Sequence, residues 1–358
     1  MMISDEQVRR ILADSVWAPS GDNCQPWKYI FEQDRLKIYH LPIRGEHPLN
    51  IAGAASLISL GCVLESIRVS ASIDGFQSKV TFGSFPTDSD ALWATVEFQE
   101  DPTLIPDSLA GFLRIRATDR RLFKGGEISD QSLESVGSTP ISSLYVTSNV
   151  NEGLIEAILS AEELMVEHDD VLPNVLKWTR MSMRSARETK DGLSWRNMGV
   201  QPWEVPVLPV IKHFPKSLGL FRSSMRKSHR ARVRQQLQSS AGLVCVTVKE
   251  ANLTDLVGAG QLMMRAWLQL TSLGYGVQPL TFASLIPFAA HLGPSEFKRN
   301  VNWMSRLNRV RETVANAFQV PTGEKIVWMI RTGISDPLPE NLRTFRQDVE
   351  KVLSIPGK

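Results

Sequence analysis

The amino-acid sequence predicts an α+β fold built from two halves, each with strands and one long apolar helix. The chain has 358 residues, which exceeds the usual size of one domain and favours two domains or one duplicated unit. Apolar residues three and four positions apart predict long helices over 54–73 and 253–273. Each helix ends at a glycine, and aligning the two end glycines places Gly61 opposite Gly260. This weak repeat favours the duplicated unit, with two unrelated apolar helices as the alternative.

The first half is predicted to begin with a helix and to contain four strands. Ser4 is an N-cap signal with Gln7 three residues on, and apolar residues continue the helical face to Val16. The strands are predicted at 28–31, 35–40, 79–82 and 92–98, with a Glu-Gln-Asp turn between the first two and a Pro/Asp/Ser turn between the last two. In the long helix, Gly61 would allow another helix to approach closely.

The second half is predicted to alternate strands and helices. Strands are predicted at 242–249 and 325–331, a strand with a loop at 275–282 and a further helix at 299–318. Met263 and Trp267 lie on the second long helix and are expected in the core.

The composition shows no pattern typical of a secreted, membrane-spanning or metal-binding protein. The net charge is +2, and the amino terminus lacks the apolar stretch of a secretory signal. The least polar run, 51–64, is shorter than the roughly 20 residues that cross a bilayer. The three cysteines and six histidines show no metal-ligand spacing. We therefore expect a cytoplasmic protein with no metal site and no membrane partner.

A basic segment occupies residues 176–238. It carries fourteen lysines and arginines against three acidic residues, so its net charge is +11. Such a local excess could steer an anionic small molecule or the phosphates of NAD(P)H. Nucleic acid is the competing partner, but no binding module or interleaved aromatic pattern is present, so none is expected. Four prolines between Gly199 and Gly219 rule out one continuous helix and predict an extended flap between two basic helices.

The turn-rich decapeptide 18–27 lies between the first helix and the first strand. Pro19 and its neighbours break both helix and ladder, while Ser20, Asn23 and Gln25 carry short side chains that donate and accept hydrogen bonds. The pattern is consistent with an ordinary connection or with a polar clamp on a ligand.

A second informative stretch is 114–123, Arg-Ile-Arg-Ala-Thr-Asp-Arg-Arg-Leu-Phe. Arg116, Thr118 and Arg120 alternate along it, and guanidinium groups with a hydroxyl between them suit a phosphate. A solvated basic segment is the alternative.

Together, the two stretches resemble motifs of the nitroreductase superfamily. Residues 19–27 resemble its Pro-Ser-x-x-Asn-x-Gln-Pro-Trp loop, and 116–120 resembles its Arg-x-Ser-x-Arg/Lys element, with Thr118 for the usual serine. The resemblance implies FMN as cofactor and NAD(P)H as a reductant. The residues that it implies as FMN contacts are Pro19, Ser20, Asn23, Gln25, Arg116, Thr118, Arg120, Gly276, Gln278, Pro279 and, after the last strand, Arg343, with Arg346 as the alternative.

The order of the motifs implies a fused architecture. The loop precedes the phosphate element by about ninety residues, whereas in an ordinary nitroreductase the phosphate element comes first and the two motifs meet across a homodimer interface. The chain therefore resembles the Acg-type branch, in which two nitroreductase-like halves form an internal pseudo-dimer around one flavin. We expect halves at 1–110 and 111–358, with 176–238 as a lid, in a monomer.

The expected activity is that of an FMN-dependent oxidoreductase acting on a small molecule. FMN would carry the hydride chemistry, so no catalytic side chain is predicted, and Arg120 is expected to stabilise the reduced flavin. A flavin-storage protein with a closed lid is the first alternative. A structural or nucleic-acid-interacting protein without flavin is the second.

Overall fold

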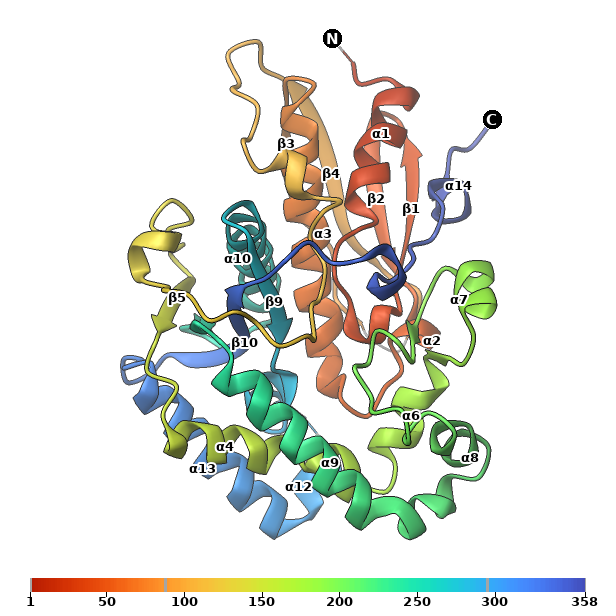
Figure 1. Cartoon of the computed structure of the whole chain (residues 1–358). Helices are drawn as coiled ribbons and strands as arrows, with labels where there is room; N and C mark the ends of the chain where they lie inside the picture. The colour runs from red at the N-terminus through yellow and green to blue at the C-terminus, as the bar shows by residue number, and fades with distance from the viewer. Residues whose placement is uncertain (1, 87–88, 294–295, 358) are drawn as a thin grey trace.

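The computed structural model describes residues 2–86, 89–293 and 296–357, and it combines helices with two main sheets (Figure 1). The first sheet has the order β11-β1-β2-β4-β3 and contains β1 (Trp27–Glu32), β2 (Arg35–His40), β3 (Phe76–Phe82), β4 (Leu92–Glu100) and β11 (Leu353–Ser354). The four predicted strands are confirmed. The turn between β1 and β2 has only two residues, Gln33 and Asp34, both at positive φ. Residues 87–88 of the other predicted turn lie outside the described residues.

The first helix, α1 (Asp5–Ser15), begins as predicted. Ser4 and Gln7 form a capping box, which satisfies two backbone amides at the helix start. The buried face of α1 contains Val8, Ile11 and Leu12 and packs against the long helix α3 (Ala54–Ser72).

The second sheet has the order β5-β8-β10-β9 and contains β5 (Ser142–Thr147), β8 (Gly242–Val248), β9 (Tyr275–Pro279) and β10 (Lys325–Ile334). Its topology matches that of the first sheet. In each, two antiparallel strands are followed by a long helix and an edge strand, and the next strand returns between them. β5 was not predicted, because only its register against β8 distinguishes it from a loop.

The two long helices, α3 and α10 (Leu253–Ser272), are confirmed and cross at the centre of the molecule (Figure 1). A Cβ on Gly61 would lie 2.0 Å from the Val257 carbonyl oxygen, and one on Gly260 would lie 2.1 Å from the Ile58 carbonyl oxygen. Only glycine fits at these two positions, which the sequence alignment placed opposite each other. The crossing therefore brings equivalent positions of the two halves into contact.

The helical stretch Ile51–Ser72 is longer than the apolar run 51–64 that the sequence suggested. Its 22 residues, with a mean hydropathy of 1.4, are long and apolar enough to cross a membrane by length and composition. The prediction that this run is too short is therefore wrong, because the helix extends beyond Leu64. Within the described structure, 83% of its apolar window is buried, mainly under α10 and α1, as in the core helix of a globular protein.

A helical segment connects β5 to β8, at the place where the first sheet has its two-residue turn. It contains α4 (Glu152–Glu162), α5 (Leu164–Glu167), α6 (Val171–Lys177), α7 (Met183–Thr189), α8 (Val207–His213) and α9 (Leu218–Gln238), with the short strands β6 (Thr179–Arg180) and β7 (Leu193–Ser194). The predicted extended flap is wrong, because α8 lies within it. Pro206 precedes α8 and Pro209 lies in its first turn, where no helical amide hydrogen is needed.

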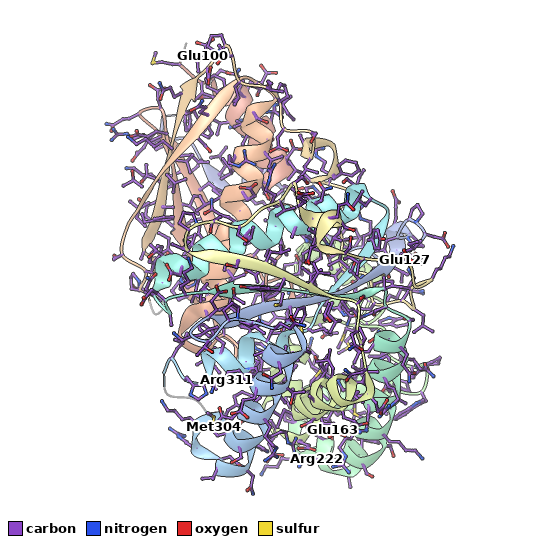
Figure 2. All side chains as sticks on the ribbon, turned by 90° about the vertical axis from the view of Figure 1, so that its left-hand side faces the viewer. Glu100, Glu127, Glu163, Arg222, Met304 and Arg311 are labelled. Carbon is purple, nitrogen blue, oxygen red and sulfur yellow. The ribbon has the colours of Figure 1, made fainter. Side chains whose placement is uncertain are left out.

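The charge of this segment is largely neutralised within the molecule. Ion pairs join α9 to acidic residues before or beside it: Arg222 to Asp169, Arg226 to Glu167, Arg230 to Glu156 and Glu163, Arg232 to Glu204, and Arg234 to Glu152 and Glu156. Figure 2 shows Glu163 and Arg222 at the same end of the molecule, far from Glu100. Most of these acids precede residue 176. Five acids outside 176–238 thus offset five of the eleven excess charges, so the arginines of α9 do not act as a free steering field.

The remaining α-helices lie in both halves of the chain. They are α2 (Pro42–Gly45) in the first half and α11 (Leu285–Ala289), α12 (Glu296–Arg299), α13 (Val301–Ala317) and α14 (Val349–Val352) in the second. After β10 the chain crosses to the first half, where β11 pairs in parallel with β1 (Figure 1). Residues 335–352 therefore connect the second sheet to the first.

Candidate functional site

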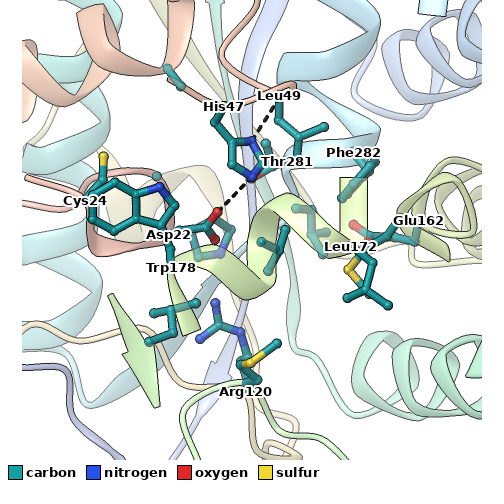
Figure 3. Close-up of a pocket in the computed structure, with 18 of the residues that line it drawn as sticks. Asp22, Cys24, His47, Leu49, Arg120, Glu162, Leu172, Trp178, Thr281 and Phe282 are labelled. Carbon is teal, nitrogen blue, oxygen red and sulfur yellow. Dashed lines mark hydrogen bonds and ion pairs between the residues drawn. The ribbon is translucent and has the colours of Figure 1, made fainter. Parts of the chain in front are cut away.

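Two adjoining cavities lie where the decapeptide loop, the long helices, the inserted segment and the C-terminal segment meet. The arginine cavity, of about 170 Å³, is lined by residues that include Pro19, Ser20, Arg116, Thr118, Trp267, Arg343 and Arg346. The lid cavity, of about 240 Å³, is lined by residues that include His47, Glu162, Trp178, His229, Gln278 and Phe282 (Figure 3). Both are lined by Asp22, Ser59, Arg120, Pro279 and Thr281. The two cavities therefore share one wall.

Three guanidinium groups that lie close together line the arginine cavity. Arg116 comes from the segment before β5, whereas Arg343 and Arg346 come from the C-terminal segment. Each has a buried Nε atom that makes no hydrogen bond within the described part of the chain. These three donors therefore have no protein acceptor among the described residues. They include both candidate C-terminal arginines.

The electrostatics of this cluster are unfavourable without a counterion. Arg116 stacks on the ring of Trp267 at 4.4 Å and donates to the Trp17 carbonyl oxygen at 2.5 Å. Burial lowers the pKa of Arg116 to about 10. Burial, and then the charges of Arg116 and Arg343, also hold the pKa of Arg346 far below its usual value. A bound dianion would supply both the missing acceptors and the missing negative charge.

The decapeptide loop is anchored to other segments by its amide side chains. Asn23 donates to the carbonyl oxygens of Gly192 and Phe345, at 3.0 and 2.9 Å. Gln25 donates to the Lys190 carbonyl oxygen and accepts from the Gln347 amide, at 3.0 and 2.9 Å. The loop therefore ties the inserted segment to the C-terminal segment. Gln25 lines neither cavity, since its amide is used in these contacts.

The other predicted residues are distributed around the shared wall. Thr118 bridges to Val277 of β9, next to Gln278 and Pro279, which line the lid cavity. Gly276 lines neither cavity. A Cβ there would lie 2.6 Å from the Phe123 ring, so this glycine permits close packing. The predicted contacts of Gln25 and Gly276 with a cofactor stay predictions.

Arg120 is a half-buried cation at the junction of the cavities. It donates to the Asn197 carbonyl oxygen at 2.8 Å, and burial lowers its pKa, opposed by the nearby charges of Asp22 and Glu162. Among the described residues, no carboxylate forms an ion pair with Arg120, so its remaining donors are available to a ligand.

Two histidines that the sequence reasoning did not assign to the site line the lid cavity. The Leu49 amide donates to Nδ1 of His47 at 3.0 Å, so the ring proton lies on Nε2, 3.3 Å from Asp22 (Figure 3). Burial lowers the pKa of His47, with Asp22 opposing. No spacing in the sequence could have shown this pair, because it joins two loops.

His229 has the same arrangement. Arg232 donates to its Nδ1 at 2.9 Å, so its Nε2 carries the proton and faces Glu162 at 3.5 Å. The lid cavity thus presents two neutral imidazoles, each beside a carboxylate. The rest of its lining is largely apolar and includes Met165, Leu172, Val175, Met198, Leu208, Met225 and Phe282.

Met263 and Trp267 are buried, as predicted, and they also line the arginine cavity. Among the residues with described positions, no group of three or more histidine, cysteine or acidic side chains is arranged to hold a metal ion.

Comparisons with known proteins place this site in context. No family model matches the chain. It is 24% identical over 280 residues to an uncharacterised protein of Mycobacterium tuberculosis, which covers 75% of this chain and 38% of the relative. It is 32% identical over 133 residues to a "putative NAD(P)H nitroreductase" of the same species, which covers 35% of this chain and 38% of the relative. The chain thus spans 38% of the length of these curated relatives.

Solved structures that align with this chain include two nitroreductases. A "putative nitroreductase" from Anabaena variabilis aligns with a TM-score of 0.45 and 10% identity, over 92% of this chain and 88% of that one. The FMN-dependent nitroreductase NfnB from Mycobacterium smegmatis, in complex with NADPH, aligns with a TM-score of 0.36 and 13% identity, over 68% of this chain and 96% of that one.

Proposed function

We propose that this chain is an FMN-dependent oxidoreductase of the nitroreductase type, and the arginine cluster is the observation that carries the proposal. Its three orphaned Nε donors fit a phosphate dianion in a cavity that Pro19 and Ser20 also line. The similarity to a mycobacterial nitroreductase over 133 residues supports the same class.

The proposed architecture is an internal pseudo-dimer that encloses one flavin in a monomer. The matching topologies of the two sheets support it, as does the contact between Gly61 and Gly260. The halves correspond to 1–110 and 111–358, with the C-terminal strand β11 returned to the first half. Residues 176–238, together with α4 and α5 before them, form the lid.

The residues present would hold FMN along the two cavities. Arg116, Arg343 and Arg346 would bind the phosphate, and Trp267 would line the space beside it. When bound, FMN supplies the hydride-transfer chemistry, with NAD(P)H as reductant. Arg120 places positive charge at the junction, and the apolar lid residues exclude water from the lid cavity.

The pair of Asp22 and His47 can hold a proton beside the lid cavity. The Leu49 amide keeps the His47 proton on Nε2, and the Asp22 carboxylate orients that N–H. Because the single N–H of His47 is turned toward Asp22, we propose that the pair holds this proton at the wall of the lid cavity.

Flavin storage is a second candidate function, and the anchored loop favours it. Asn23 and Gln25 tie the loop to Gly192 and Lys190 of the lid, which holds the lid closed over the junction. Steady-state oxidation of NADPH and NADH with a quinone or nitroaromatic distinguishes the two functions. Turnover supports the enzyme, and tightly held FMN without turnover supports storage.

The visible spectrum of the purified protein tests the proposal directly. We expect a yellow protein with about one FMN per chain, because the chain has one arginine cluster beside one decapeptide loop. Reconstitution with excess FMN that leaves the protein colourless would overturn the proposed function, and two flavins per chain would overturn the pseudo-dimer.

A further inference from the structure

Arg331 on β10 is a fully buried guanidinium whose hydrogen-bond partners are all neutral. Its Nε donates to Gln278 Oε1 at 2.7 Å, and its terminal nitrogens donate to the carbonyl oxygens of Gln236 and Arg121 at 3.0 and 2.7 Å. Its side chain is 0% exposed and stacks on the ring of Phe123 at 4.0 Å. The charge of Arg331 is therefore solvated only by dipoles and a ring face.

A buried arginine of this kind lowers the stability of the folded state. A buried charge without a counterion destabilises the fold relative to an apolar side chain of similar volume. Burial lowers the pKa of Arg331 to about 9, with the nearby charge of Asp119 opposing. Asp119 itself is ion-paired with Arg121 at 2.7 Å. Folding therefore offers no reason for arginine at this position.

The neighbouring Gln278 supplies a reason. It lies directly opposite Arg331 in the β9–β10 register and lines the lid cavity. Arginine can only donate, so the amide oxygen of Gln278 must face it. The Nε2 group of Gln278 makes no hydrogen bond within the described part of the chain and is left for the cavity.

We propose that Arg331 is a positioning residue that holds the Gln278 amide with its N–H donors toward the bound group, and that its uncompensated charge makes bound FMN easier to reduce. The inference rests on the proposed function, since it assigns a residue to the same site. Arg120, within range of Arg331, adds to the same positive field.

Gln278→Glu separates this role from a structural one. The new carboxylate would pair with Arg331 and satisfy its charge, so we expect a higher melting temperature of the apoprotein. It would also remove the amide donor and add negative charge at the cavity. We therefore expect the preference for reduced over oxidised FMN to fall at least tenfold, a decrease of about 30 mV in the two-electron midpoint potential. Arg331→Lys, which keeps the charge but not the planar fork, should lower the potential less.

The measurements are the midpoint potential against a reference dye and the melting curve of each variant. Lys124→Gln is the matched control, because it removes an exposed cation whose backbone bonds to the end of β10 and whose side chain pairs with Asp336; its potential should equal that of the wild type. A higher melting temperature with an unchanged potential in Gln278→Glu would overturn the inference and leave Arg331 structural. A wild-type protein that binds no FMN would instead overturn the proposed function.

Discussion

Two arginine-rich regions of this molecule differ in how their charge is compensated. Helix α9 places Arg222, Arg226, Arg230, Arg232 and Arg234 against acidic residues, and each has a carboxylate partner. The arginine cluster brings together Arg116, Arg343 and Arg346 with carbonyl, hydroxyl and aromatic partners and orphaned Nε atoms. Charge density in the sequence is higher around α9, yet the proposed phosphate site lies in the cluster.

The difference teaches that an anion site is marked by uncompensated burial rather than by the number of basic residues. A paired arginine on a surface helix already has its negative partner, so it gains little from a second one. A partly desolvated guanidinium without a carboxylate gains the full strength of a charge-assisted bond. Substitutions in the two regions should therefore affect FMN binding and stability differently.

The largest effect is expected from removing two members of the cluster. In Arg116→Met/Arg346→Met, two charge-assisted contacts of ~1.5–3 kcal/mol each are lost, so the FMN dissociation constant should rise roughly a hundredfold to ten-thousandfold. The apoprotein should melt at the same or a higher temperature, since two mutually repelling cations are gone. FMN fluorescence quenching and melting curves measure both quantities.

Riboflavin is the control for this variant, because it lacks the phosphate. Its affinity should change little between the wild type and the double variant. Equal losses for FMN and riboflavin would mean that the cluster supports the fold of the cavity and binds no phosphate.

The next largest effect is expected from a buried pair of the lid. Arg232→Met removes the partner of Glu204, whose side chain is 2% exposed, and leaves a buried carboxylate without a cation. We expect the free energy of unfolding to fall by ~3–5 kcal/mol, measured by urea denaturation. Adding Glu204→Gln should restore much of the stability. The preference for FMN over riboflavin should not change. A lost preference would contradict the expectation that helix α9 and the arginine cluster have separate roles.

Much of the fold could be predicted because its signals are local. The capping box at Ser4, the helical periodicity and the end glycines set the ends of α1, α3 and α10 within the sequence itself. Gly61 predicted a close helix approach, and the structure confirms it. The flap was mistaken for extended chain because Pro206 and Pro209 are compatible with a helix start as well as with a break.

The site could be predicted only in part. Local motifs identified Arg116 and Arg120, which line the cavities. The pair of His47 with Asp22, and the Arg331 contact with Gln278, depend on how distant segments meet. The acids that pair with α9 lie at 152–169 except for Glu204, so a count within 176–238 missed most of them.

The buried imidazole of His40 differs from both arginine regions, because it can lose its charge by releasing a proton. His40 is 2% exposed and stacks on Trp93 at 4.0 Å, and neither ring nitrogen has a hydrogen-bond partner among the described residues. Burial lowers its pKa to about 4, with Asp90 opposing, so its neutral form is favoured in the folded state. Because the unfolded chain binds this proton at pH values below ~6.5, stability should fall by about 3 kcal/mol as the pH falls from 6.5 to 4.

His40→Phe, which keeps a stacked ring, should remove this part of the acid sensitivity. Urea denaturation of the two proteins between pH 7 and pH 4 provides the measurement. Parallel pH profiles would show that the charge of His40 is compensated at low pH.

The smallest effect is expected from an exposed arginine of α9. Arg226 is half-exposed and lies 3.4 Å from Glu167, which also pairs with Arg306 at 2.6 Å. Arg226→Ala should therefore lower the free energy of unfolding by less than ~1 kcal/mol. The change should shrink further in 1 M salt, where the screening length is about 3 Å. FMN affinity should stay the same at either salt concentration. If Arg226→Ala weakened FMN binding tenfold, with the loss relieved by salt, the field of α9 would reach the flavin and the two regions would act as one anion site.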